Sequence, residues 1–186
     1  MEDVLPLPGS ISLNIDEIRR GSPGPEEFVT DLYVKFRPSL ISYVYHLLGS
    51  TRDAEDIVQV AFLQLFDQVN RNVEIRNVRG WLYRVVHNLA IDFVRRSGRR
   101  ETLFEEWFAD HDARSSAESV EQELIDREQI EISLSRLNER ERHCLMLRAE
   151  GLSYQEIADV LDTTAKSVSV YLARGLKKFE SRHEDK

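Results

Sequence analysis

The chain has 186 residues, of which 41% are hydrophobic and 31% charged, and its formal net charge at pH 7 is −8. This length allows one medium-sized core or two small ones, and the composition is too polar for a membrane protein. No run approaches the roughly 20 apolar residues that a membrane helix needs, and the first residues lack the basic start and apolar stretch of a secretory signal. We therefore expect no membrane association and a cytoplasmic location.

The chain begins without sustained periodicity, which predicts a mobile tail over residues 1–24. A proline followed by two acids then marks the start of the first helix. We expect helices over 25–48, with a break or kink at Pro38, over 52–68, and over 78–97. Apolar residues recur at intervals of three and four, and alternating runs are absent, so the chain is predicted to be all-α.

The helix expected over 52–68 has two contrasting faces. Its core face consists of Ala54, Ile57, Val58, Ala61 and Leu65. The opposite face places two apolar side chains among acids and an amide, and it comprises Asp53, Asp56, Gln59, Val60, Leu63 and Asp67. This opposite face is either a solvated surface with two stray hydrophobic residues or a docking surface for a partner with apolar and basic groups.

The segment over 71–100 is strongly basic, with eight arginines against two acids, a local charge of +6. The stripe expected to be buried in its helix is Leu82, Val85, Val86, Leu89 and Phe93. A line beside that stripe mixes an aromatic ring, an amide, an acid and three arginines: Trp81, Arg84, Asn88, Asp92, Arg95 and Arg99. The preceding loop adds Arg71, Asn72, Arg76, Asn77 and Arg79.

These groups suit a nucleic acid, because arginines neutralise phosphates, amides bond base edges and an aromatic ring stacks on an unpaired base. The alternative is a solvated amphipathic helix whose Trp81 belongs to the core. Residues 101–131 reverse the charge, with eleven acids against two arginines, a local −9. Charges farther apart than a Debye length of about 10 Å are largely screened, so the acidic total does not exclude nucleic-acid binding.

The charge pattern also predicts domains. An acidic linker is expected over 101–127, and it separates a first domain over 25–100 from a second over 128–183. Over residues 164–182, five bases against one acid give a local charge of +4. The two basic segments are therefore separate.

The stretch GLSYQEIADVLDTTAKSVSVYLARGLKKF has the pattern of a helix-turn-helix. Ser153 and Glu156 have the spacing of a capping box that starts a helix at Tyr154, and Thr164 is expected to cap the second helix. Such patterns occur by chance in helical proteins, but capping, small packing residues and a basic outer face together favour DNA binding. The residues suited to a major groove and its phosphates are Thr164, Lys166, Ser167, Ser169, Val170, Tyr171, Arg174, Lys177 and Lys178.

An enzyme is the least supported class. The five histidines lie in unrelated positions, and no metalloprotease motif, phosphate-binding glycine loop or nucleophile motif appears. Cys144 lies among apolar neighbours and is predicted to be a buried structural thiol. We expect no catalytic residue, no metal and no cofactor.

Over residues 26–183 the motifs, taken in order, resemble a known family. DAEDIVQVAFLQLF, then WLYRVVHNLAIDFVRR, an acidic linker, LSRLNERERHCLMLRAEGLSYQEIADVL and a final basic helix are similar to the extracytoplasmic-function sigma factors of bacterial RNA polymerase. The resemblance implies two small helical domains joined by the linker. A region 2-like bundle would bind the polymerase clamp coiled coil and open the −10 element, and a region 4-like helix-turn-helix would read the −35 element.

The resemblance also implies partners and roles. The partners are core RNA polymerase, through its clamp coiled coil and flap, promoter DNA as duplex and single strand, and an anti-sigma factor as a further candidate. By this resemblance, the face over 53–67 falls in the polymerase-binding helix. Arg71 to Arg79 fall in the loop that captures a flipped base. The residues from Trp81 through Arg96 fall in the helix at the point of strand opening. The acidic linker matches the segment that threads toward the RNA exit path.

Several positions depart from the family pattern. Val60 stands where relatives usually have an acid, and Asp162 stands where the turn usually has glycine. Ser169, Val170 and Tyr171 replace a stretch that is often richer in arginine. The promoter sequence therefore cannot be copied from any relative, and the upstream contact is expected to rely on Tyr171 and Arg174.

Two other functions compete with transcription initiation. One is a sigma-like decoy that sequesters an anti-sigma factor without touching DNA, which should have lost the basic faces that this chain has kept. The other is a helix-turn-helix regulator that acts without polymerase, which leaves both faces of the first domain unexplained.

Overall fold

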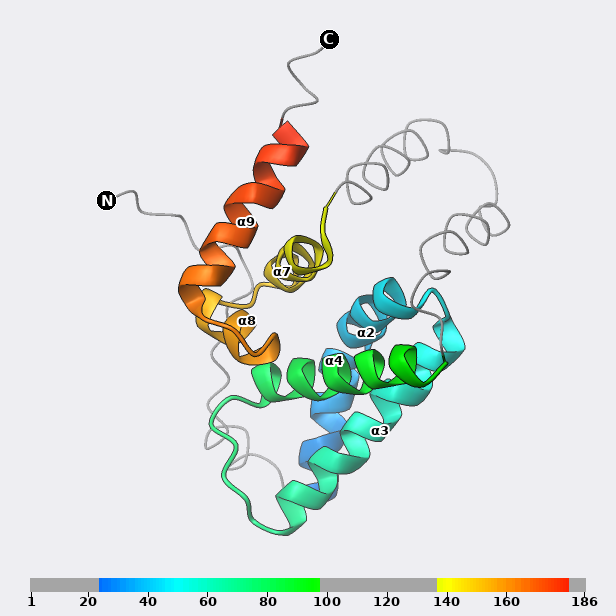
Figure 1. Ribbon diagram of the computed structural model, residues 1–186. Coiled ribbons are helices and arrows are strands. Elements are labelled where there is room, and N and C mark those ends of the chain that lie inside the picture. Colours follow the sequence, from blue (N-terminus) through cyan, green and yellow to red (C-terminus); the bar gives the residue numbers. More distant parts are fainter. Residues whose placement is uncertain (1–23, 98–136, 181–186) are drawn as a thin grey trace, which may run out of the picture. The chain divides into compact units, whose positions relative to one another are not determined.

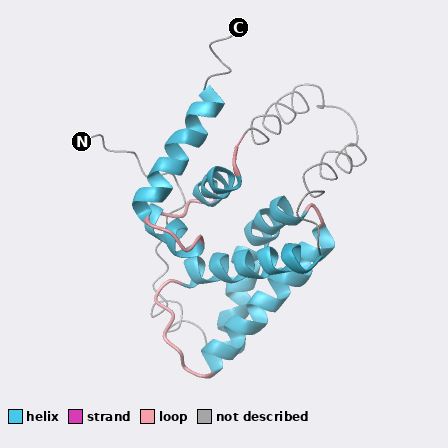
Figure 2. Cartoon of the chain, viewed as in Figure 1, coloured by secondary structure: helices cyan, strands magenta, loops and turns pink. Residues whose placement is uncertain are grey.

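The computed structural model describes residues 24–97 and 137–180, and every regular element in these ranges is a helix (Figure 1, Figure 2). The all-α prediction is confirmed there, while the predicted linker over 101–127 and nearly all of the predicted tail lie outside the described residues. The chain divides into two compact units. The first holds α2 (Pro25–Leu48), α3 (Thr51–Asn70) and α4 (Val78–Ser97), and the second holds α7 (Glu139–Ala149), most of α8 (Tyr154–Val160) and α9 (Ala165–Glu180).

The turn between α2 and α3 is set by two adjacent residues. Gly49 ends α2 with a left-handed φ of 70°, and its N–H donates to the Tyr45 carbonyl oxygen at 2.7 Å. Ser50 then caps α3, because its hydroxyl oxygen accepts from the Asp53 N–H at 3.3 Å. So short a connection lays the two helices side by side as a helical hairpin (Figure 1).

The core of the first unit follows the expected periodicity. The predicted core face of α3 is confirmed, since all five of its residues are buried. Ala54 and Ala61 are fully buried, so their small side chains lie on the packed side of α3. On α2 the buried residues recur mostly every four positions and include Phe28, Leu32, Phe36, Leu40, Val44 and Leu48.

Pro38 lies inside α2, which continues through it. The helix is therefore not broken there, and the kink that was the other form of the expectation stays a prediction. Proline removes one backbone hydrogen bond and normally destabilises a helix interior. Here Phe36 and Leu40 are buried on either side of Pro38, and this packing outweighs the local loss.

The buried stripe of α4 differs from the predicted one. Leu82 and Val86 are buried as expected, but Tyr83 and His87 are buried with them. Val85, Leu89 and Phe93 are only half-buried. The buried face is thus rotated toward the two polar aromatic residues.

Tyr43 of α2 explains that rotation. Its hydroxyl lies 2.8 Å from Nδ1 of His87, and its ring meets that of Tyr83 edge-on with centroids 5.5 Å apart. A buried polar atom is costly unless it has a hydrogen-bond partner. Because Tyr43 and His87 satisfy one another, both rings can join the core.

The second unit is built from helices with well-formed caps. The predicted capping box of α8 is confirmed, with Ser153 N–H to Glu156 Oε2 at 2.7 Å and Glu156 N–H to Ser153 Oγ at 3.3 Å. Thr164 caps α9 as predicted, accepting from the Ser167 N–H at 3.1 Å. A further capping box, formed by Asn138 and Glu141, starts α7.

Two positions set how these helices join. At Gly175 of α9 an added Cβ would lie 2.7 Å from Cδ1 of Leu145, so glycine allows α9 to approach α7 closely. Asp162, in the turn between α8 and α9, has a left-handed φ of 50°. Aspartate is one of the few residues other than glycine that adopt this conformation at moderate cost, which accounts for the departure from glycine noted in the sequence.

Replacing Tyr43 by Phe should destabilise the first unit. The change removes a buried hydroxyl from His87 but keeps the packing volume, so the free energy of unfolding should fall by about 1–2 kcal/mol. Urea unfolding followed by circular dichroism measures the change. Tyr33→Phe, a half-buried tyrosine on the same helix, should stay within about 0.5 kcal/mol of the original protein. Equal losses in the two variants would contradict the role of the Tyr43–His87 bond.

Candidate nucleic-acid interface

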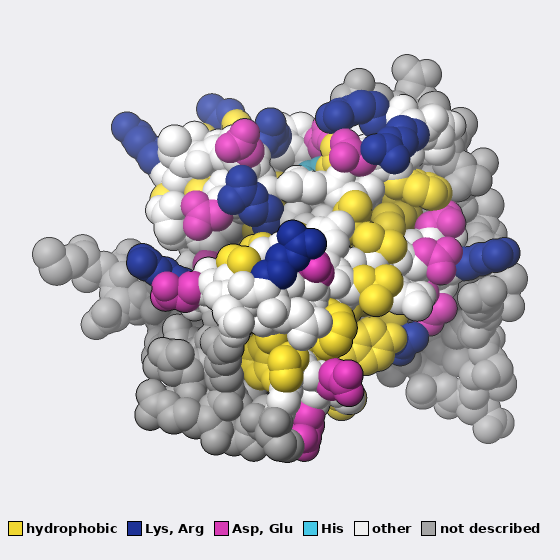
Figure 3. All heavy atoms as spheres, turned by 90° about the horizontal axis from the view of Figure 1, so that it is seen from below, with side chains coloured by type: hydrophobic (Ala, Val, Ile, Leu, Met, Phe, Trp, Pro, Cys, Tyr) yellow, Lys and Arg dark blue, Asp and Glu magenta, His cyan; other side chains and the backbone are white. Residues whose placement is uncertain are grey.

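The α3 face, defined as Asp53, Asp56, Gln59, Val60, Leu63 and Asp67, points away from the core as predicted. Leu63 is 61% exposed and Val60 41% exposed. Asp56, Gln59 and Asp67 are also exposed, while Asp53 is half-buried. In the space-filling view of Figure 3, apolar side chains gather in patches that charged side chains border. By their exposed fractions, Val60 and Leu63 are the apolar groups of the α3 face, and they lie among exposed acids.

A loop over 71–77 joins the α3 face to α4. Arg71 ends α3, and its Nε donates to Oδ1 of Asp67 at 2.9 Å. Asn72 follows with a left-handed φ of 54°. The Arg76 side chain is 90% exposed, and its Nε lies 3.7 Å from Oε1 of Glu74. Solvent-exposed pairs of this kind contribute little, so Arg76 is readily available to an external anion.

Asn77 and Val73 refine the prediction for this loop. The Asn77 side chain accepts from the Gly80 N–H at 3.0 Å and so caps α4. Its predicted role as a DNA-binding group is therefore accompanied by a structural one. Val73 is 47% exposed and is not among the predicted DNA-binding residues. An apolar side chain in an otherwise polar loop is a pattern from which the sequence could have singled it out.

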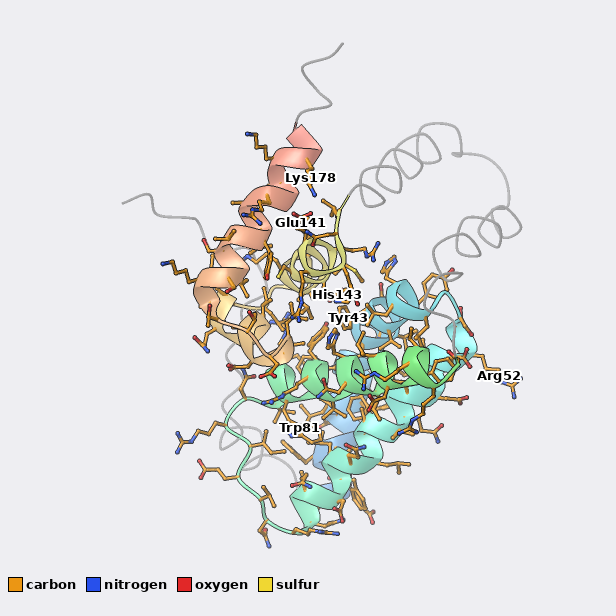
Figure 4. All side chains as sticks on the ribbon, in the orientation of Figure 1. Tyr43, Arg52, Trp81, Glu141, His143 and Lys178 are labelled. Atoms are coloured by element: carbon orange, nitrogen blue, oxygen red, sulfur yellow. The ribbon has the colours of Figure 1, made fainter. Side chains whose placement is uncertain are left out.

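The outward line of α4 continues the basic surface. Trp81, labelled in Figure 4, is half-buried, so part of its ring packs against the protein and part is open to a partner. Asp92 is half-buried and accepts from Arg95 at 3.2 Å, and Arg79 is also half-buried. Arg99 lies outside the described residues. The exposed members of the line are Arg84, Asn88 and Arg95, and Arg96, which lies beside the line, is exposed as well.

The outward face of α9 is the second basic surface. Thr164 and Ser167 meet there, with their hydroxyl oxygens 2.9 Å apart, because both belong to the cap of the helix. Tyr171 is half-buried. The exposed members are Thr164, Lys166, Ser169, Val170, Arg174 and Lys177. One helix face thus presents three cations around a small polar and apolar centre.

Lys178 departs from the prediction of an outward side chain. Its Nζ donates to Oε2 of Glu141 at 2.6 Å, and that carboxylate is only 2% exposed. Figure 4 shows the two residues on α9 and α7. The same carboxylate oxygen accepts from the Asn138 N–H at 3.0 Å. Lys178 therefore joins α9 to α7, and its charge is largely neutralised within the protein.

The protonation of Glu141 reflects this arrangement. Burial opposes ionisation of the carboxylate, but the hydrogen bonds from Lys178 and Asn138 and the charges of Lys178 and Arg174 outweigh it. They hold the pKa of Glu141 below its ordinary value of 4.5. The Asn138–Glu141 spacing is that of a capping box and was readable in the sequence. The sequence did not indicate that Glu141 would be buried, because it lies in a helix rich in charged residues.

Three further features of the described residues concern metal ligands, the cysteine and helix hydropathy. No group of three or more histidines, cysteines or acids there is arranged to hold a metal ion. Cys144 is buried as predicted, and burial raises the pKa of its thiol to about 11, so the thiol stays protonated at neutral pH. Within the same residues no helix has the length and hydropathy to cross a membrane.

Two sequence profiles match the chain, one in each unit. The profile of sigma-70 region 2 matches residues 32–100, which include most of α2 and all of α3 and α4. The profile of sigma-70 region 4 matches residues 127–179, which include α7, α8 and nearly all of α9. The two matches follow the order of the two basic surfaces.

Similar proteins carry related descriptions. The chain is 34% identical over 150 residues to the ECF RNA polymerase sigma factor SigE of Mycolicibacterium smegmatis, an alignment that covers 75% of this chain and 56% of SigE. It is 25% identical over 156 residues to the RNA polymerase sigma factor SigZ of Bacillus subtilis, covering 82% of this chain and 85% of SigZ. The chain thus spans little more than half of SigE but most of SigZ.

A solved structure supports the fold. The sigma factor RpoE of Bartonella quintana, solved in complex with the anti-sigma factor NepR, is similar with a TM-score of 0.61 and 19% sequence identity. The similarity covers 82% of this chain and 94% of RpoE. At this identity the comparison establishes the helical architecture.

Replacing Lys178 by Met should destabilise the second unit by about 2–3 kcal/mol, because it leaves the buried Glu141 carboxylate without its cation. Lys177→Met, at the exposed neighbouring position, should change stability by less than about 0.5 kcal/mol. Thermal unfolding of the three proteins measures the difference. Equal stability of the two variants would show that the pair does not hold α9 to α7.

The loss of stability caused by Lys178→Met should depend on pH. The folded pKa of Glu141 lies below its unfolded value, so its ionised form stabilises the folded state above pH 4.5, and this contribution is lost as the pH falls through the folded pKa. The stability that Lys178→Met loses relative to the original protein should therefore be largest near neutral pH and become smaller in acid. A deficit that stays constant between neutral pH and pH 3 would contradict an ionic origin.

Proposed function

Because this chain belongs to the extracytoplasmic-function sigma factors of the sigma-70 family, we propose that it binds core RNA polymerase and directs promoter-specific initiation of transcription. It recognises a −35 and a −10 element and opens the duplex. It acts without catalytic residues or a cofactor of its own, and it works in the cytoplasm, where polymerase and promoters meet.

The α3 face is the observation that carries this proposal. Val60 and Leu63 are exposed among acids on the side of α3 opposite to the core. Exposed apolar groups with a charged rim are typical of protein interfaces. We assign this face to the clamp coiled coil of core polymerase. A helix-turn-helix regulator that acts alone has no use for such a face, which is why we prefer a polymerase-binding factor.

The loop over 71–77 and the outward line of α4 are assigned to the −10 element. Unstacking costs about 1.4 kcal/mol per base step on average, so an opened strand needs a surface that holds it. The exposed arginines supply phosphate contacts, Asn88 supplies bonds to base edges, and Trp81 supplies an aromatic ring beside them. A decoy that avoids DNA has no need of these exposed groups.

The outward face of α9 is assigned to the −35 element as duplex. Its three exposed cations, Lys166, Arg174 and Lys177, contact phosphates, and the residues between them face the bases. Contact between this unit and the polymerase flap belongs to the same proposal. An anti-sigma factor is a further proposed partner, supported by the complex in which the similar RpoE was solved.

The first test concerns polymerase binding. Replacing Asp56 by Arg and Leu63 by Glu together should weaken binding to core polymerase about 100-fold or more, because two central groups of the interface change character. Co-purification and fluorescence titration measure the effect, with helix content checked by circular dichroism. Asp31→Arg with Val34→Glu makes the same two changes at exposed positions of α2 and should bind normally. Unchanged binding by the α3 variant would falsify the assignment.

The second test separates strand opening from the other steps. Asn88→Ala and Arg95→Ala should reduce the permanganate reactivity of thymines near the start site several-fold, because the opened strand loses contacts. Transcription from a template with a pre-melted bubble should recover. Arg52→Ala removes an exposed arginine at the start of α3 and should leave opening intact (Figure 4). If the bubble fails to restore transcription, the α4 surface has another role.

A further inference from the structure

Val170 occupies an unusual place on α9. It is 40% exposed, although valine is usually buried. The buried side of the helix is formed by Val168, Leu172 and Gly175. At 100° per residue, Val170 lies about 140–160° around the helix from each of them. Its side chain therefore points directly away from the core of its own unit, and folding has no use for its apolar surface.

The neighbours of Val170 are cations. Lys166 and Arg174 lie one turn before and one turn after it, each offset by about 40° around the helix, and Lys177 lies within about 20° of the same line. All three are exposed. A row of cations suits the phosphates that border a groove, and the residue at its centre then faces the bases. Val170 is the large apolar residue at that centre.

Valine offers no hydrogen-bond donor or acceptor, so it can recognise only an apolar group. In the major groove of B-DNA that group is the 5-methyl of thymine. A β-branched side chain in a helix is held in essentially one rotamer, so its position is fixed before DNA binds and little entropy is lost on contact. Shape, position and chemistry therefore agree.

We propose that Val170 contacts the 5-methyl group of a thymine in the upstream promoter element, and that this contact selects thymine at one position. The inference rests on the proposed function, because it needs α9 to lie in the major groove. Beyond the proposed function, the inference names the base that Val170 recognises and the chemical group of that base that it contacts.

The test removes only that methyl group. Holoenzyme reconstituted from core polymerase and the full chain first selects binding sites from duplexes randomised over both promoter elements. Each thymine of the selected upstream element is then replaced singly by uracil, which keeps every hydrogen-bonding group. At one position uracil should raise the Kd about three- to fivefold, the effect expected from burying one methyl group.

Two variants test whether Val170 is the residue that recognises the methyl group. Val170→Ser should bind thymine and uracil equally at that position, because the apolar partner is gone. Val34→Ser makes the same substitution at a valine of α2 that is 71% exposed, and it should keep the full thymine preference. Circular dichroism checks that both variants retain their helix content. A thymine preference in Val170→Ser equal to that of the original protein overturns the inference.

Two further readouts separate the possible failures. An apolar contact does not release counterions, so the thymine preference should persist between 50 and about 200 mM salt while overall affinity falls. A preference that disappears with salt overturns the inference. If the holoenzyme selects no upstream element at all, the proposed function fails. If an element is selected but no thymine is sensitive to uracil, the function stands and the role of Val170 is rejected.

Discussion

Each helix over residues 24–97 and 137–180 buries one side against its own unit, and what it presents to a partner is the surface that remains. In the first unit, Leu40 and Val44 of α2 and Ala54 and Ala61 of α3 have no exposed surface. This packing fixes the rotation of α3 about its axis, and that rotation turns Leu63 outward. The α3 face is therefore a consequence of the core. The candidate functional residues on α3 and α9 are displayed by the helices themselves, and those of residues 71–77 lie in a loop.

Much of this arrangement follows from local rules that act within one or two helical turns. Hydrophobic periodicity was sufficient for the core face of α3, because alanine, valine and leucine have no polar atoms that need partners. Capping residues predicted the start of α8 at Tyr154 and the cap at Thr164, because these bonds join residues three positions apart. The helix-turn-helix was readable for the same reason. The directions of Val60 and Val170 followed from geometry alone.

Two features that the sequence analysis missed, the buried residues of α4 and the inward side chain of Lys178, depend on pairs of residues far apart in the chain. Tyr83 and His87 were not among the residues predicted to be buried. Their polar atoms are costly to bury, and the bond that lets His87 join the core comes from Tyr43, 44 residues earlier. Lys178 was expected to face DNA, but it meets Glu141, 37 residues earlier. A sequence pattern contains no record of such pairings. The number of charges available to a nucleic acid is therefore smaller than the number of basic residues.

The uninterrupted passage of α2 through Pro38 has a consequence for its motions. Proline has no N–H, so the carbonyl of Val34, four residues earlier, receives no helical hydrogen bond from it. Water can reach that carbonyl, because the Val34 side chain is on the solvent side and 71% exposed. Phe36 and Leu40 hold the two halves of the helix together on the buried side of this turn. Because a missing backbone hydrogen bond is a usual site of helix bending, the turn around Pro38 is the point at which α2 should bend at least cost.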